Sequence, residues 1–260
     1  MAYIETAQQL RGSVASWHLL HVVALSKSFG LRTAVTDVTF AVGHGEVVGL
    51  IGPARSGRST IIHLLAGTVA PTFGRITIAG KDVTQLAPDA RSRRGIISAL
   101  HLPELFRDLT VLECVLMGGA TSQPPFFSRR GGKSYQDDAM ATLELAGLGG
   151  MSHVRAEALS PCQQCFLAIA VALAARPVLL LLDDPAAGMT QAERTTLRSL
   201  IGSIREAGTS VLLAERDISI LTEACDRMLV LSSGRIIADD VPSRIARNPV
   251  VMEAYLNRSQ

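Results

Sequence analysis

The chain has 260 residues, of which 48% are hydrophobic, with 22 Gly, 11 Pro and a formal net charge of +2. This length suits one large domain, or a core domain with a smaller lobe, and the apolar content excludes a disordered or collagen-like chain. Because 25 basic residues are nearly balanced by 23 acidic ones, we expect protein or small-molecule partners and no nucleic acid.

Cysteine content and hydropathy indicate a protein of the reducing cytoplasm. Four cysteines, without a recognisable secretion signal in residues 1–20, argue against a disulfide scaffold. The longest uncharged stretch, residues 158–175, includes Ser160, Pro161 and two glutamines, which leaves too short an apolar segment to span a bilayer. If the protein acts at a membrane, we expect another chain to cross it.

The first part of the chain alternates short β-branched or aliphatic runs with a helical segment, a pattern typical of an α/β domain. Residues 1–19 precede the first run and form a predicted N-terminal extension. The predicted strands are residues 22–25, 37–40, 46–51, 75–79 and 96–100, and the predicted helix is 59–67.

The middle of the chain, residues 109–159, has apolar residues at helical spacing and is a predicted second lobe. A loop rich in Pro, Gly and basic residues, TSQPPFFSRRGGK, interrupts this spacing at 121–133. We therefore expect the core to consist of residues 20–108 and 160–256, with the lobe inserted between them.

The last part returns to alternating helices and strands. A helix over 163–175 precedes a continuous apolar run, 178–182, as expected for a strand buried on both faces. Thr190 and Glu193 form a predicted capping box for a helix that ends before Gly208. Two further strands are predicted at 210–214 and 228–231.

A glycine-containing loop between strand 46–51 and helix 59–67 has the context of a phosphate-binding loop. Glycines allow backbone N–H groups to converge on anionic oxygens at a helix N-terminus, and Ser59 is placed to ligate Mg²⁺. Arg58 stands where such loops normally have Lys, although its planar guanidinium is bulkier. Taken alone, the segment also fits an ordinary turn. The loop consists of Gly52, Pro53, Ala54, Arg55, Ser56, Gly57, Arg58, Ser59 and Thr60.

Two carboxylates, Asp183 and Asp184, end the apolar run 178–182. Asp183 is placed to hold Mg²⁺ through water, and Asp184 to polarise the attacking water in phosphoryl transfer. Two acids at the end of a strand also fit a simple turn. Their combination with the phosphate-binding loop favours the functional interpretation.

Eight segments in chain order carry a family resemblance: SKSFGLRTAVTDVTF, GEVVGLIGP, PTFGRITIAGKDVT, LTVLECVLMG, LSPCQQ, LLLLDDPAAGM, CDRMLVLSSGRIIADDVPSRI and EAYL. From about Leu20 to Leu256, the chain resembles the ATP-binding subunits of ABC transporters. The closest likeness is to importers of branched-chain amino acids and urea. The resemblance implies a P-loop NTPase (RecA-like) core with an antiparallel β subdomain and a helical lobe.

The same resemblance assigns roles to residues. It implies that Phe29 stacks on adenine and that residues 52–60 wrap the phosphates of ATP. It implies that Ser160, Cys162 and Gln163 belong to a signature segment that closes over ATP bound to the opposite subunit. The expected partners are transmembrane permease subunits and a second ATP-binding subunit, at the cytoplasmic face of the membrane.

Five residues depart from this family at the positions where it places its chemistry. Arg58 replaces the loop Lys, and His101 stands where a Gln that senses Mg²⁺ and the γ-phosphate is expected. Cys162 replaces the signature Gly, Asp184 replaces a catalytic Glu, and Arg216 occupies the position of a switch His. An arginine donates hydrogen bonds but cannot accept them as a neutral imidazole does. We therefore predict weak hydrolysis by this chain.

Two alternatives remain open from the residues. The chain is a working Mg²⁺-dependent ATPase if the substituted groups are adequate. It is a structural or regulatory module if it does not turn over at all. In that module Cys162 and Cys165, a C-x-x-C at a helix N-terminus where the dipole lowers a thiolate pKa, would act as a redox pair. The basic run Arg91–Arg94 is interpreted as a solvated face.

Overall fold

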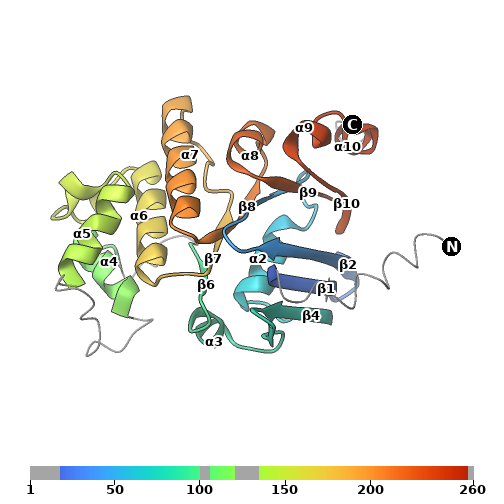
Figure 1. Ribbon diagram of the computed structural model, residues 1–260, viewed down its shortest axis with the longest axis horizontal. Helices are drawn as coiled ribbons and strands as arrows, with labels where there is room; N and C mark the ends of the chain where they lie inside the picture. The colour runs from blue at the N-terminus through green and yellow to red at the C-terminus, as the bar shows by residue number, and fades with distance from the viewer. Residues whose placement is uncertain (1–17, 100–105, 121–134, 257–260) are drawn as a thin grey trace.

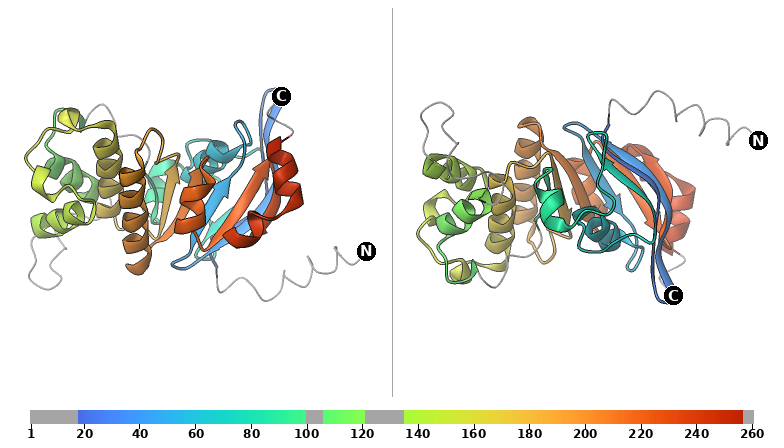
Figure 2. Two further views of the ribbon diagram at one scale, coloured as in Figure 1. Left: turned by 90° about the horizontal axis from the view of Figure 1, so that it is seen from above. Right: turned by 90° about the horizontal axis from the view of Figure 1, so that it is seen from below.

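The computed structural model describes residues 18–99, 106–120 and 135–256. Three helices gather at one end of the molecule and two sheets occupy the other (Figure 1). Both views of Figure 2 show the same division, with one further helix, α7 (Gln191–Glu206), between the helical end and the sheets. The three helices are α4 (Val111–Ala120), α5 (Tyr135–Leu145) and α6 (Pro161–Ala174).

A six-stranded sheet forms the centre of the fold, in the order β10-β9-β3-β8-β7-β6. Five of its strands are parallel, and the edge strand β10 pairs antiparallel with β9. The predicted strands in these regions are confirmed with small shifts at their ends, except that Leu100 lies outside the described residues. The strands are β3 (Val47–Ile51), β6 (Ile96–Ser98), β7 (Leu179–Asp183), β8 (Ser210–Glu215), β9 (Arg227–Ser232) and β10 (Arg235–Asp240).

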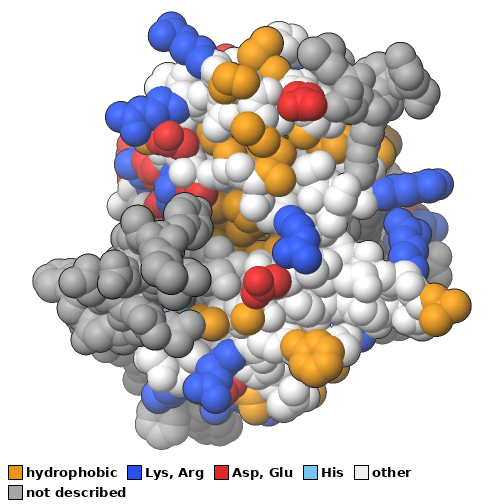
Figure 3. Space-filling view, turned by 90° about the vertical axis from the view of Figure 1, so that its right-hand side faces the viewer, with side chains coloured by type: hydrophobic (Ala, Val, Ile, Leu, Met, Phe, Trp, Pro, Cys, Tyr) orange, Lys and Arg blue, Asp and Glu red, His pale blue; other side chains and the backbone are white. Residues whose placement is uncertain are grey.

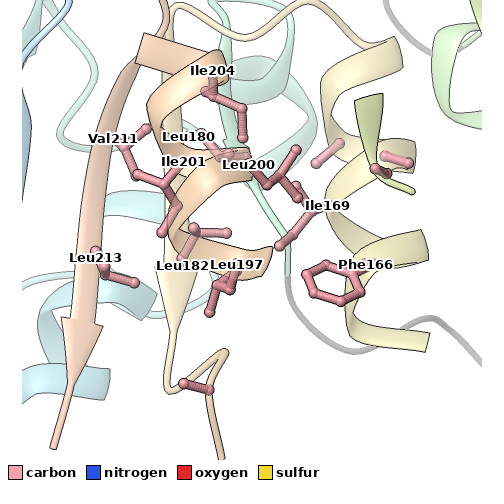
Figure 4. Packing of buried hydrophobic residues seen from close by; sticks show 14 of the residues in the cluster. Phe166, Ile169, Leu180, Leu182, Leu197, Leu200, Ile201, Ile204, Val211 and Leu213 are labelled. Carbon is pink, nitrogen blue, oxygen red and sulfur yellow. The ribbon is translucent and has the colours of Figure 1, made fainter. Parts of the chain in front are cut away.

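Both faces of this sheet are covered by other elements. Successive side chains of a strand point to opposite faces, so neighbouring residues of one strand join different clusters. In β7, Leu180 and Leu182 belong to one hydrophobic cluster, and Leu179 and Leu181 to another. Helices α6 and α7 cover the first face, as Figure 4 shows. The second face packs on α2 (Arg58–Ala66) and on a smaller sheet. Burial on both faces explains why β7 is apolar without alternation.

The smaller sheet is antiparallel, with the order β2-β1-β4-β5. It confirms the predicted strands near residues 22, 37 and 75, although β1 and β2 are longer than predicted. Gly30, with a φ of 58°, lies in the turn that joins β1 to β2. The strands are β1 (His18–Phe29), β2 (Arg32–Gly43), β4 (Phe73–Ile78) and β5 (Lys81–Asp82).

The predicted capping box begins α7. Thr190 is its N-cap, and the Thr190 side chain and the Glu193 side chain each accept a hydrogen bond from the other's backbone N–H. Four apolar side chains along one stripe of α7 pack between the central sheet and α6 (Figure 4). These side chains are Leu197, Leu200, Ile201 and Ile204.

The interpretation of Arg91–Arg94 as a solvated face is wrong for Arg91, which is 1% exposed. Its guanidinium donates to the backbone oxygens of Leu64 and Leu65 in the last turn of α2, and to those of Thr84 and Leu86. Carbonyl groups at a helix C-terminus lack intrahelical partners, and a cation there also suits the helix dipole. Arg91 therefore caps the C-terminal end of α2 from the interior.

Several short elements were not predicted. They include β5, β10, α3 (Pro88–Ser92), η2 (Gly149–Met151), η3 (Ala156–Ala158), α8 (Ile218–Ala224), α9 (Pro242–Ile245) and α10 (Pro249–Leu256).

No helix within the described ranges is long and apolar enough to cross a membrane. On the face shown in Figure 3, basic and acidic side chains are interspersed.

Candidate functional site

The predicted phosphate-binding loop connects β3 to α2, as expected. A Cβ added at Gly52 would lie 2.2 Å from the Leu231 backbone oxygen, so only glycine allows this approach of the loop to β9. Gly57 has a φ of 109° directly before α2. Arg55 also has a positive φ, 64°, which costs a residue with a side chain some free energy.

The loop borders a hollow of about 250 Å³. Gly234, in the β9–β10 turn, donates its N–H to the Ser56 backbone oxygen over 2.9 Å. This bond ties the loop to the β9–β10 turn. Convergent N–H groups at a helix N-terminus beside basic side chains form an environment for anionic oxygens. The lining residues are Arg32, Ala34, Ala54, Arg55, Ser56, Gly57, Arg58, Ser59, Thr60 and Arg216.

Arg58 lines the hollow but is largely buried, with 6% of its surface exposed. One terminal nitrogen, Nη1, donates to the Gly52 backbone oxygen within the same loop. The Arg58 Nε is buried and has no hydrogen-bond partner among the described residues. The guanidinium is therefore committed in part to the loop's own backbone.

The structure brings the two predicted magnesium ligands together. Ser59 lies in the first turn of α2, Asp183 ends β7, and the Ser59 hydroxyl donates to the Asp183 Oδ1 over 3.2 Å. A hydroxyl and a carboxylate from two elements are the hard oxygen ligands that Mg²⁺ prefers. This donor set fits a magnesium ion held beside the phosphate-binding loop.

Asp184 and Arg216, both predicted catalytic residues, form an ion pair. The Arg216 Nε lies 2.8 Å from the Asp184 Oδ2, and the Arg216 side chain is 72% exposed. Asp184 has a φ of 46°, and its N–H donates to the Ala214 oxygen on β8. The second oxygen, Oδ1, is buried and has no partner among the described residues. One oxygen of the Asp184 carboxylate is thus paired with the Arg216 guanidinium, which stays positively charged.

Glu215 is a residue of the site that sequence reasoning missed. It ends β8, is 3% exposed, and accepts the N–H of Ala186 over 2.7 Å and that of Arg216 over 3.1 Å. Burial raises the pKa of this carboxyl above its ordinary value. The signal that could have found it is a carboxylate at the end of a continuous apolar strand, as at Asp183.

The predicted signature segment lies apart from the chain's own phosphate-binding hollow. Ser160 is the N-cap of α6 and forms a capping box with Gln163. Neither of these residues nor Cys162 lines the hollow. Their neighbours Pro161, Gln164 and Cys165 line a second hollow of about 460 Å³, together with Asp183 and Asp184.

Phe29 and His101 are the remaining predicted site residues. Phe29 is 50% exposed at the end of β1 and pairs with Arg32, which lines the phosphate-binding hollow. The Lys27 Nζ lies 5.0 Å from the centre of the Phe29 ring. His101 lies outside the described residues.

The C-x-x-C thiols lack the lowered pKa on which the redox alternative depends. Burial, with a smaller contribution from the neighbouring Glu193, raises the pKa of Cys162 to about 12. Burial likewise raises the pKa of Cys165 to about 11, and both thiols are free. Thiols of this kind are poor nucleophiles near neutral pH.

Comparison with known proteins places these features in context. A family model described as ABC transporter matches residues 35–187. The chain is 32% identical over 253 residues to BraF, the high-affinity branched-chain amino acid transport ATP-binding protein of Pseudomonas aeruginosa, covering 93% of this chain and 98% of BraF. It is 34% identical over 242 residues to the phosphonates import ATP-binding protein PhnC 2 of Rhodopseudomonas palustris, covering 91% and 89%.

Solved structures agree with these sequence matches. The crystal structure of the ADP conformation of MJ1267, an ATP-binding cassette, superposes with a TM-score of 0.82 at 26% identity, covering 92% of this chain and 98% of that one. The predicted fold class, an α/β core with an antiparallel β subdomain and a helical lobe, is confirmed.

Proposed function

This chain belongs to the ABC transporter family as an ATP-binding subunit, and from that premise we propose that it serves an importer for branched-chain amino acids or a related small polar solute. The near-complete coverage of BraF supports this choice of substrate class. We propose that the chain binds MgATP, couples nucleotide-driven dimer closure to transport, and hydrolyses ATP weakly itself.

The ion pair between Asp184 and Arg216 carries the proposal of weak hydrolysis. Phosphoryl transfer depends on positioning and on electrostatic stabilisation of the attacking water and the transferred group. Asp184 cannot accept freely from a water while one oxygen faces Arg216 at 2.8 Å and the other is buried. One terminal nitrogen of Arg58 is bonded to the Gly52 oxygen, so it is not free to donate to a phosphate.

Binding requires less of the chain than hydrolysis does. The loop N–H groups would hold the phosphates, Phe29 would stack on the base, and Ser59 with Asp183 would hold Mg²⁺. Bound Mg²⁺ would neutralise charge on the β- and γ-phosphates. The signature residues Ser160, Cys162 and Gln163 do not line the chain's own hollow, which supports a site completed by a second ATP-binding subunit.

The remaining partners follow from the family. Subunits of this kind carry nucleotide and leave passage through the membrane to other chains. We propose that α4, α5 and the connection to α6 contact a transmembrane permease subunit and keep the protein at the cytoplasmic face of the membrane. Among the alternatives, the redox module loses support because both thiols have a raised pKa.

Calorimetry with the purified chain tests the proposal. MgATP should bind, and Asp183→Asn should weaken binding several-fold in the presence of Mg²⁺ while leaving binding without Mg²⁺ nearly unchanged. Steady-state ATP hydrolysis by the parent should stay close to that of Asp183→Asn. Absence of heat and of thermal stabilisation at millimolar MgATP would refute the binding function. Robust turnover that Asp183→Asn abolishes would establish the active ATPase instead.

A further inference from the structure

The C-x-x-C of α6 contacts the turn that follows the site's carboxylates. The Cys165 Sγ donates to the Pro185 backbone oxygen over 3.4 Å. Pro185 comes directly after Asp184, and Cys165 lines the same hollow as Asp183 and Asp184. The thiol therefore links the first turns of α6 to the backbone immediately after β7.

The far end of the same connection is fixed by the capping box of α7. The Glu193 carboxylate accepts the N–H of Thr190 over 2.7 Å and the Thr190 hydroxyl over 2.8 Å. The segment from residue 184 to 193 is thus held by α6 near its start and by the first turn of α7 at its end.

The turn is also held by β8. The Ala186 N–H donates to the buried Glu215 carboxylate over 2.7 Å, while the Asp184 N–H donates to the Ala214 oxygen. The backbone around Pro185 therefore has contacts with both α6 and β8. Loss of either contact would free a segment that continues directly from the Ser59 partner, Asp183.

We propose that Cys165 is a positioning residue, whose thiol fixes the start of the 184–193 segment against α6 and so sets the carboxylates of the site. The contact consists of this thiol and its acceptor, the Pro185 oxygen. It gives Cys165 a role as a hydrogen-bond donor, in place of redox chemistry.

The protonation of the Cys165 thiol agrees with this role, because a thiol donates a hydrogen bond only while it carries its proton. Burial raises the pKa of Cys165 to about 11. The donor therefore stays protonated near neutral pH, and the same feature slows its alkylation and oxidation.

Amide hydrogen exchange of the full chain tests the Cys165 contact without nucleotide. In Cys165→Ala, the Ala186 and Ala187 amides should exchange about tenfold faster, with β8 and α4 unchanged. Cys165→Ser, which retains a donor, should restore most of the protection. The control is Cys225→Ala, which removes a thiol in contact with β3 instead. Equal exchange at residues 184–189 in the parent and Cys165→Ala would overturn the proposal.

The effect on the site rests on the proposed function and is measured separately. The preference for ATP with Mg²⁺ over ATP in a chelator should fall about threefold in Cys165→Ala and recover in Cys165→Ser. Faster exchange with an unchanged magnesium preference would refute the positioning role. If the parent itself binds no nucleotide, the proposed function fails, and hydrogen exchange still decides whether the Cys165 contact holds the segment.

Discussion

Two of the five residues that depart from the family, Asp184 and Arg216, contact each other in the structure. Asp184 is one methylene shorter than the expected Glu, and Arg216 reaches it from the next strand of the sheet at 2.8 Å. Considered separately, each substitution removes a catalytic group. Considered together, they form an ion pair that ties the end of β7 to the residue after β8. The pair is partly exposed, so its role is local arrangement more than overall stability.

Glu215, the buried carboxyl beside this pair, gives a prediction for pH dependence. Burial raises its folded-state pKa above the ordinary 4.5, so the folded protein binds this proton more tightly than the unfolded chain does. Its contribution to stability is therefore present at low pH and is lost as pH rises from the ordinary value through the raised one. Glu215→Gln cannot ionise and keeps an oxygen for the Ala186 N–H.

The measurement is urea denaturation of the parent and Glu215→Gln over a series of pH values. The free energy of unfolding of the variant, relative to that of the parent, should increase with pH through this window. Parallel curves for the two proteins would contradict the raised pKa of Glu215.

At the scale of elements, α2 depends on Arg91 at its C-terminal end as well as on the loop at its start. Arg91→Ala would leave the Leu64 and Leu65 carbonyls without this buried donor. We expect the free energy of unfolding to fall by about 3 kcal/mol. Arg93→Ala, which removes only an exposed ion pair with Asp89, should change it by less than about 0.5 kcal/mol. Chemical denaturation of both variants measures this difference, and equal losses would contradict it.

Sequence patterns predicted the elements whose signals are local. The apolar run of β7, the capping box of α7 and the loop before α2 depend on neighbouring residues, and all three are confirmed. Ser59 and Asp183 were each assigned to magnesium from their local context, and the structure brings them within hydrogen-bonding distance. Arg91 was misinterpreted because a basic run looks solvated unless its distant acceptors are known.

The edge strand β10 and the thiol contacts were missed for a related reason. β10 is half exposed and polar at its end, and its pairing with β9 depends on a turn at Ser233 and Gly234, where both φ values are positive. A cysteine donating to a backbone oxygen twenty residues away leaves no periodic signal. Contacts of this type depend on tertiary packing.

At the scale of the whole molecule, we predict that one reversion will not restore ATP hydrolysis, because catalytic groups act as a unit. Asp184→Glu alone should stay near the parent rate, since Arg216 still faces the carboxylate. A fivefold reversion should recover turnover and MgATP-dependent dimerisation. The reversion comprises Arg58→Lys, His101→Gln, Cys162→Gly, Asp184→Glu and Arg216→His.

Steady-state hydrolysis and light scattering with and without MgATP measure the two effects. Adding Asp183→Asn to the fivefold variant is the control and should abolish both. Full activity of Asp184→Glu alone would show that the other four substitutions are tolerated. A folded but inert fivefold variant would show that the scaffold itself has changed.

The order of strands in the central sheet also bears on how this chain is made. β3 hydrogen-bonds only to β8 and β9 within the sheets described, so both of its neighbours come from the last quarter of the sequence. During synthesis on a ribosome, the apolar strand β3 and the loop after it leave the exit tunnel long before Ser210–Ser232 exist. Until then both edges of β3 are open to wrong pairing. We therefore expect nascent chains that stop before β8 to need chaperones, whereas completion of β9 lets the sheet close in one late step.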